Sequence, residues 1–86
     1  MSKVPLWLRL WKLIDERGES FNSIFDLVRS SDIHPANTYY SLIILEEIGL
    51  INLVRVGRVK EVHLTQKFFN TREVFRELHD AIIRQR

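Results

Sequence analysis

Residues 35–65 read PANTYYSLIILEEIGLINLVRVGRVKEVHLT, and this stretch decides the fold that the sequence predicts. In its first part, up to Gly49, apolar residues recur at the spacing of a helix. After Gly49 they recur at every second residue, which is the period of a strand. Gly57 and Arg58 are typical of a two-residue turn with glycine first. The stretch is therefore expected to form one helix followed by a two-stranded hairpin.

The turn also fixes the register of the expected hairpin. With Gly57 and Arg58 as the loop, apolar residues face each other at the base and two cations face each other near the tip. Opposed like charges are unfavourable, so either an anionic ligand binds both side chains or both are simply solvated. The predicted pairs are Val56 with Val59, Arg55 with Lys60, Leu53 with Val62 and Ile51 with Leu64.

The segment before this stretch predicts two helices joined by an extended link. An apolar stripe wider than one core face favours a first helix over residues 4–17. Phe21 lies in the extended link and is expected to bridge to the hairpin. Ser20 or Asn22 is expected to cap a second helix that begins at Ser23.

The third helix is predicted over residues 35–48, with His34 as its cap and a proline in its first turn. Its inner side would complete the core, and its outer side is polar at the start. The inner side is expected to hold Tyr39, Leu42 and Leu45, with Glu46 at its margin, and the outer side Asn37, Tyr40, Ser41 and Ile44.

The last helix is expected to be capped by Thr65 and to continue to about Gln85. The predicted fold class is mainly α with a small β-hairpin (α+β), built on a three-helix core. The single domain would span residues 1–86, with a first helix in 1–18, a helix-turn-helix in 22–49, the hairpin in 50–65 and a C-terminal helix in 66–86.

The length and composition favour self-association. A chain of 86 residues buries only about 60–65% of its unfolded surface, and the absence of cysteine excludes disulfides. Apolar residues make up 45% of the chain, more than one small core needs. We therefore expect a homodimer, with the apolar seam of the last helix packed against its twin. The expected interface residues are Trp7, Trp11, Phe68, Phe75, Leu78 and Ile82.

Positive charge is concentrated around the hairpin. Residues 52–67 contain four cations and one acid, a local charge of +3 in a chain of net charge +2. The rest of the chain then carries −1, so the expected ligand of the hairpin is an anion.

Several function classes are excluded or disfavoured. His34, His63 and His79 lack metal-ligand spacing, so no metal or other cofactor is expected. No phosphate-binding loop or catalytic triad is recognisable, so the chain is not expected to be an enzyme, and no small-molecule effector is identifiable. The apolar run of the first helix is too short to span a membrane, and a membrane-surface helix is disfavoured by its acids. A cytoplasmic protein is expected.

Four short segments carry a family resemblance: residues 38–42 (TYYSL), 45–47 (LEE), 49–51 (GLI) and 64–67 (LTQK). With the order of expected elements, they resemble the winged helix-turn-helix transcription regulators, such as the MarR, PadR and ArsR groups of bacteria and archaea. The resemblance implies that the third helix enters the major groove and that the hairpin, the wing, approaches the minor groove or the backbone. A small chain without cysteine would suit an archaeon or an archaeal virus.

Two departures from the family pattern concern the third helix. Basic or polar residues are usual where this chain has Ile43 and Ile44, and no arginine or lysine occurs early in the helix. Ile44 could contact thymine methyl groups or pack against a partner.

The expected function is that of a homodimeric, double-stranded DNA-binding transcription regulator. The alternative is a winged-helix protein–protein interaction module within a larger assembly, without direct DNA binding. The polar side chains could also form an ordinary solvated helix face, and those that begin the second helix could simply cap it. The expected DNA contacts are Asn37, Thr38, Tyr40, Ser41, Arg55, Arg58, Lys60, Asn22 and Ser23.

Overall fold

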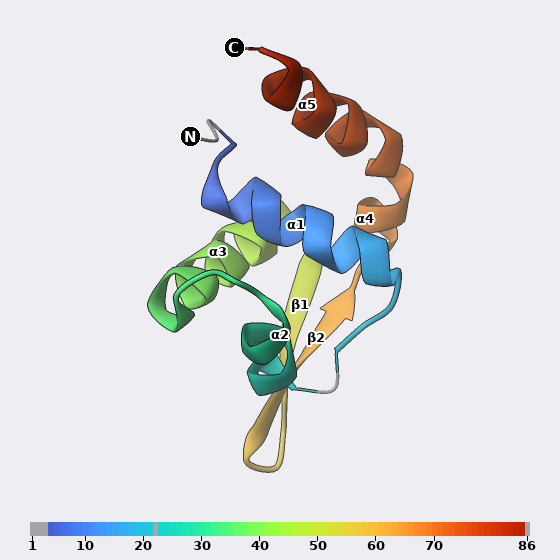
Figure 1. Cartoon of the computed structure of the whole chain (residues 1–86). Coiled ribbons are helices and arrows are strands. Elements are labelled where there is room, and N and C mark those ends of the chain that lie inside the picture. Colours follow the sequence, from blue (N-terminus) through green and yellow to red (C-terminus); the bar gives the residue numbers. More distant parts are fainter. Residues whose placement is uncertain (1–3, 22, 86) are drawn as a thin grey trace.

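A computed structural model describes residues 4–21 and 23–85 and has the small α+β architecture that the sequence predicts (Figure 1). The two strands form one antiparallel sheet, and its turn projects beyond the helices. Within the described residues, no helix is long and apolar enough to cross a membrane. The elements in chain order are α1 (Leu6–Arg17), α2 (Ile24–Ser30), α3 (Pro35–Ile48), β1 (Ile51–Val56), β2 (Val59–Leu64), α4 (Gln66–Asn70) and α5 (Arg72–Arg84).

Helix α3 begins and ends where the sequence predicts. Pro35 is its first residue, and Nδ1 of His34 accepts a hydrogen bond from the backbone N–H of Ala36 at 3.2 Å. Gly49 ends the helix with φ 92°, a left-handed conformation that glycine adopts without strain. The predicted cap and boundaries of this helix are confirmed.

The predicted register of the hairpin is confirmed at all four pairs, from Val56 with Val59 at the turn to Ile51 with Leu64 at the base. Gly57 has φ 63°, and no described residue other than glycine has a positive φ, which suits a turn with glycine first. The predicted bridge is also present: Phe21 and Val62 exchange two backbone hydrogen bonds of 2.9 Å.

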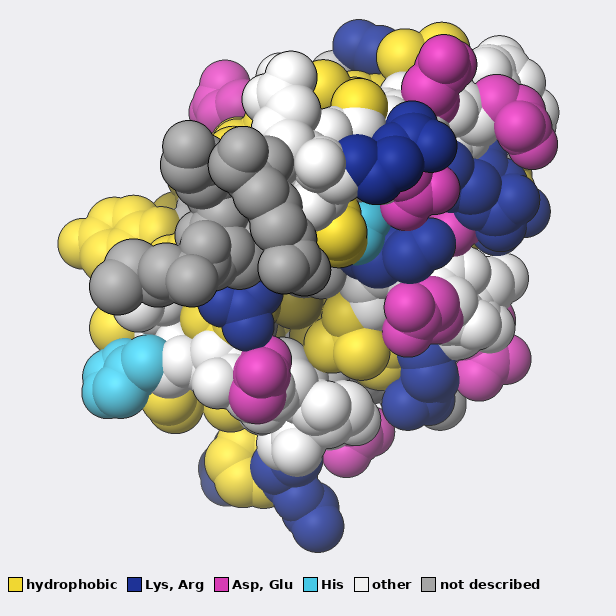
Figure 2. Space-filling view, turned by 45° about the horizontal axis from the view of Figure 1, so that its top comes forward, with side chains coloured by type: hydrophobic (Ala, Val, Ile, Leu, Met, Phe, Trp, Pro, Cys, Tyr) yellow, Lys and Arg dark blue, Asp and Glu magenta, His cyan; other side chains and the backbone are white. Residues whose placement is uncertain are grey.

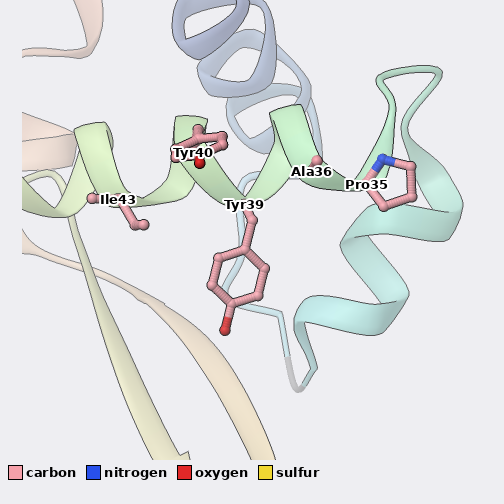
Figure 3. A pocket seen from close by; sticks show the side chains of 5 residues that line it. All are labelled: Pro35, Ala36, Tyr39, Tyr40 and Ile43. Carbon is pink, nitrogen blue, oxygen red and sulfur yellow. The ribbon is translucent and has the colours of Figure 1, made fainter.

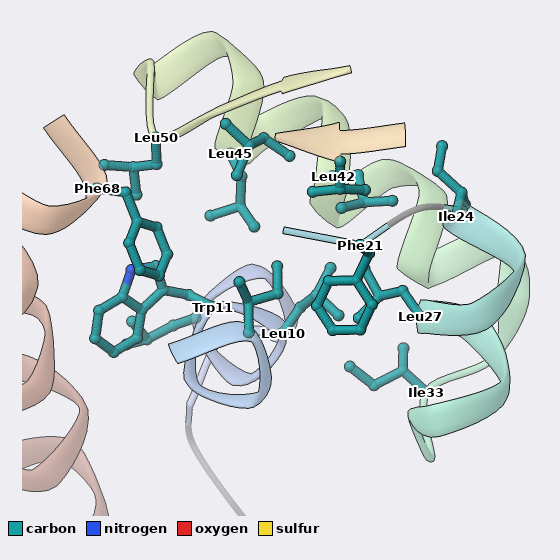
Figure 4. Packing of buried hydrophobic residues seen from close by; sticks show 14 of the residues in the cluster. Leu10, Trp11, Phe21, Ile24, Leu27, Ile33, Leu42, Leu45, Leu50 and Phe68 are labelled. Atoms are coloured by element: carbon teal, nitrogen blue, oxygen red, sulfur yellow. The ribbon is translucent and has the colours of Figure 1, made fainter. Parts of the chain in front are cut away.

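The core lies between helices α1, α2 and α3 and one face of the hairpin base (Figure 4). Trp11 and Phe68 meet at its edge, with 5.7 Å between their ring centroids. The buried hydrophobic residues are Val4, Leu8, Leu10, Trp11, Ile14, Phe21, Ile24, Leu27, Ile33, Leu42, Leu45, Leu50, Ile51, Val62 and Phe68.

The C-terminal segment differs from the prediction of one continuous helix. The helix is interrupted at Thr71, whose hydroxyl donates a 2.7 Å hydrogen bond to the carbonyl oxygen of Lys67. The preceding short helix, α4, starts with the predicted cap: Thr65 accepts a hydrogen bond from the N–H of Phe68. Because α4 turns toward α1, Phe68 enters the core instead of continuing a seam along α5.

This break corrects part of the expected dimer interface. Trp11 and Phe68 are fully buried inside a single chain, so they are not available to a second copy. Trp7 and Phe75 make an edge-to-face contact of 6.1 Å and are half-buried against the core, as is Ile82. Among the six residues predicted for the interface, this leaves Leu78 as the exposed one.

The buried carboxylate of Asp15 attaches α5 to α1. It accepts hydrogen bonds from Nε of Arg72 at 2.7 Å and from Nε of Arg76 at 2.8 Å. The hydrogen bond to Asp15 raises the pKa of Arg76 above its ordinary value, against a smaller opposing effect of desolvation. An arginine with a raised pKa stabilises the fold at every pH below its ordinary value and loses that contribution only at higher pH, so this pair is intact at neutral pH.

The structure also corrects two helix starts. Pro5 precedes α1 as its cap, so the helix begins at Leu6. Helix α2 is capped by Ser23, whose Oγ accepts a 3.0 Å hydrogen bond from the N–H of Phe25, and not by Ser20. Ser20 instead accepts a hydrogen bond from the N–H of Leu64, while Asn22 lies outside the described residues.

Candidate nucleic-acid interface

The four predicted contact residues of α3 divide into two pairs. Asn37 and Tyr40 are exposed, as expected, but Thr38 and Ser41 are buried. The hydroxyl of Thr38 donates to the carbonyl oxygen of His34 at 3.2 Å. Neither Thr38 nor Ser41 is therefore available to DNA in this structure, which corrects the prediction for both.

Tyr39, which was expected on the inner side of α3, lies on the outer side. It is 43% exposed, and its side chain points into the space between the hairpin and α2 (Figure 3). Nζ of Lys60 lies 5.9 Å from the centroid of its ring. The inner stripe of α3 consists of Thr38, Ser41, Leu42 and Leu45. Two small polar residues therefore occupy buried positions of a kind that helical periodicity assigns to apolar residues.

The exposed side of α3 has no cation, is apolar in its middle and carries the acids Glu46 and Glu47 in its last turn. Ile43 and Ile44 are 42% and 40% exposed, so neither belongs to the core of this chain. A shallow hollow of about 530 Å³ crosses this side and is lined by Pro35, Ala36, Tyr39, Tyr40 and Ile43 (Figure 3). This side of α3 therefore offers shape and apolar contact rather than positive charge.

The hairpin provides the positive charge. Arg55, Arg58 and Lys60 are all exposed, and none of them takes part in the ion pairs found among residues 4–21 and 23–85. The one hairpin acid, Glu61, contacts His63 at 2.8 Å. The lower, projecting end of the molecule in Figure 2 accordingly carries dark blue side chains beside yellow ones. These three cations are free to bind an anion.

Arg55 and Lys60 lie directly opposite each other, as the register predicts, and they point to different neighbours. Nε of Arg55 donates to the carbonyl oxygen of Gly57 at 3.3 Å, whereas Lys60 extends toward Tyr39. Neither contact involves an acid, so neither charge is neutralised.

The cations and two aromatic rings line one hollow between α2, α3 and the hairpin, with a volume of about 430 Å³. Phe25, one of the two rings, is 66% exposed and was not predicted as a site residue. Its place immediately after Ile24, off the apolar stripe of α2, is the sequence signal that could have identified it. The hollow is lined by Ser23, Ile24, Phe25, Tyr39, Arg55, Arg58, Val59 and Lys60.

Three hydrogen bonds join the end of α3 to the hairpin base and to α4. The carboxylate of Glu46 accepts from the N–H of Leu53 at 2.8 Å, although Glu46 was expected merely to flank the inner side. The hydroxyl of Thr65 donates to the carbonyl oxygen of Gly49 at 2.6 Å, and Nζ of Lys67 donates to that of Ile48 at 2.7 Å. These bonds fix the angle at which α3 and the hairpin meet.

The described part of the candidate phosphate contact at the start of α2 has a structural role as a helix cap. Ser23 is half-buried and its hydroxyl is engaged as the helix cap, which is the alternative that the sequence left open. Asn22 lies outside the described residues. In the described part of the chain, no group of three or more histidine, aspartate or glutamate side chains is placed to hold a metal ion.

No family model, curated protein or solved structure matches this chain. The functional argument therefore depends on the geometry of the exposed side of α3, the hairpin cations and the hollow between them.

Proposed function

We propose that this chain is a winged helix-turn-helix protein that binds double-stranded DNA as a homodimer and regulates transcription. In this proposal α3 faces the major groove and the hairpin is the wing, which contacts the backbone or the minor groove. The observation that carries the proposal is the set of three hairpin cations, Arg55, Arg58 and Lys60, which have no acidic partner among the described residues and lie beside the exposed side of α3. Unneutralised cations on a projecting hairpin suit a phosphate backbone.

The charge distribution gives this proposal a quantitative consequence. Each phosphate contact contributes about −0.9 to the slope of log K against log salt, so three contacts predict a slope of about −2.7 per protomer. Because α3 lacks cations in its first and last turns, it adds little to that slope. Asn37 and Tyr40 are then the polar side chains of α3 that can reach base edges.

The test is a fluorescence anisotropy titration of a labelled duplex of about 25 base pairs, repeated from about 50 to 200 mM salt. Arg58→Ala is expected to weaken binding to all sequences and to make the slope less negative by about 0.9. Arg84→Ala is the matched control, since it removes the same charge from an exposed position on α5, at the opposite end of the molecule (Figure 1). Failure of the wild-type chain to bind any duplex at about 50 mM salt would overturn the proposal.

A second candidate function is a protein-interaction module, favoured by the uncharged hollow along α3. Such a module would bind DNA negligibly and would remain monomeric without its partner. Light scattering separates the two candidates, because a stable homodimer of about twice 10.3 kDa supports the DNA-binding proposal. A monomer that also fails to bind duplex supports the module instead.

A further inference from the structure

We propose that the hollow between α2, α3 and the hairpin binds an unpaired nucleotide, with its base against the aromatic rings and its phosphate on the hairpin cations. This inference goes beyond the proposed function, because a reader of intact duplex requires no unpaired base. It rests on the exposed rings of Phe25 and Tyr39, on the cations around them and on the size of the hollow.

The hollow brings together two kinds of side chain that are far apart in the sequence. Phe25 comes from α2 and Tyr39 from α3, while the cations come from the hairpin. Sites for single-stranded nucleic acid combine these features, with aromatic rings on which bases stack and a basic surface that follows the backbone. The volume of about 430 Å³ lies within the range of roughly 300–1,000 Å³ that is usual for small organic ligands.

Both rings are accessible to a planar ligand. Phe25 is 66% exposed, and the guanidinium of Arg29 lies 5.7 Å from its centroid; Lys60 lies 5.9 Å from that of Tyr39. These contacts are made by long, flexible side chains at the surface, so a base can displace them from the ring faces. A cation beside a stacked base also adds a favourable interaction with its π system.

The chemistry of the hollow selects against other occupants. Three cations disfavour a basic or purely apolar ligand. A free phosphate would bind the cations but has no flat face to stack on the two exposed rings. A ligand that is anionic at one end and aromatic at the other satisfies both sets of side chains. Bases within an intact duplex are stacked on both faces, so only an unpaired nucleotide offers a face to Phe25 or Tyr39.

The experiment compares three labelled DNAs with the full chain: a paired duplex, the same duplex with one unpaired thymine bulge, and oligothymidine. The bulged duplex or the single strand is expected to bind at least about 5-fold more tightly than the paired duplex, the lower end of what stacking one base on an aromatic side chain provides. Phe25→Ala is expected to remove this preference and to change binding to the paired duplex by less than about 2-fold.

Two further variants sharpen the test. Phe25→Trp retains a stacking surface and is expected to keep the preference, whereas Phe69→Ala removes a ring of 43% exposure on α4 and is expected to leave it unchanged. A 2-aminopurine at the unpaired position reports stacking directly, because its fluorescence falls when it stacks on a ring. Equal binding of all three DNAs, or a preference that survives Phe25→Ala, would overturn the inference.

The three DNAs also separate this inference from the proposed function. Binding to the paired duplex without any preference refutes the unpaired-nucleotide site alone. Binding only to DNAs with an unpaired base refutes duplex reading and supports the site. A preference for the bulge over oligothymidine assigns the nucleotide to a distorted duplex, and the reverse assigns it to a free single strand. No binding to any of them refutes both proposals.

Discussion

Phe68 and Phe69 are adjacent residues of the same type in opposite environments, so they provide a matched test of where α4 packs. Phe68 is fully buried, with its ring centroid 5.7 Å from that of Trp11, whereas Phe69 is 43% exposed. The perturbation is truncation of each ring separately, Phe68→Ala and Phe69→Ala. If the C-terminal segment formed one straight helix with a dimer seam, Phe68 would instead lie between two copies of the chain.

The burial of the two rings determines how much stability each truncation is expected to remove. Truncation of a fully buried phenylalanine costs about 3–5 kcal/mol, while a half-exposed one is expected to cost about 1 kcal/mol. A domain of 86 residues has a total stability of roughly 4–13 kcal/mol, so Phe68→Ala removes a large fraction of it. At about 4–8 °C per kcal/mol, the expected fall in Tm is at least about 12 °C for Phe68→Ala and only a few degrees for Phe69→Ala.

The assay is urea unfolding monitored by tryptophan fluorescence. Trp11 reports on the environment of Phe68 because the two rings are in contact. Each variant is measured at two protein concentrations about 50-fold apart. A core position predicts a loss of stability that is the same at both concentrations, whereas an interface position predicts one that depends on concentration. An equal effect of the two substitutions would refute the placement of Phe68 in the core.

Two further predictions concern the tether between α1 and α5 and the tip of the hairpin. Asp15→Asn leaves two arginines without their carboxylate, and loss of the bond from Arg72 alone is expected to lower the free energy of unfolding by about 1.5–3 kcal/mol. Glu16→Gln, at the exposed neighbouring position, is the control and is expected to change it almost not at all in the same urea titration. Gly57→Ala places a side chain at φ 63° in open space, so only backbone strain opposes it; the expected loss is about 1–2 kcal/mol, and an unchanged stability would show that the turn adopts another conformation.

Local signals in the sequence were sufficient for α3 and the hairpin. Glycine at the end of a helix and glycine first in a two-residue turn are conformational requirements of single positions, and Gly49 and Gly57 satisfy them. Once the turn is placed, the alternation of the strands determines every pair, because a shift by one residue would expose Ile51 and Val62. These features could therefore be predicted without knowledge of the tertiary structure.

Features that depend on contacts between distant segments were missed. Phe68 and Phe75 are seven residues apart and would share one face of a straight helix, so their spacing fits one helix as well as two. No glycine or proline marks the break at Thr71. The sequence gives no sign that Asp15 is buried, because its partners Arg72 and Arg76 follow 57 and 61 residues later.

The prediction of the candidate site was wrong in part for the same reason, since it also depended on contacts between distant segments. Hydrophobicity assigned Tyr39 to the inside of α3 and Ser41 to the outside, and the structure has them the other way round. A small hydroxyl residue fits a tightly packed stripe, while a tyrosine whose ring is approached by Lys60 is tolerated outside it. The choice between such residues depends on the space beneath the helix, which the sequence of the helix alone does not specify.

The junction between α3 and the hairpin explains how a helix without cations and a positively charged hairpin could act together in the proposed complexes. The hydrogen bond from the N–H of Leu53 to Glu46 joins the last turns of α3 to the middle of β1, and Lys67 joins the end of α3 to α4. The backbone of the hairpin is thereby joined to α3 before any ligand binds. Little backbone conformational entropy is then lost on binding, and the remaining entropic cost comes from ordering the three cationic side chains. In such an arrangement the hairpin sets how tightly DNA is held, and the exposed side of α3 sets which surface of the DNA it meets.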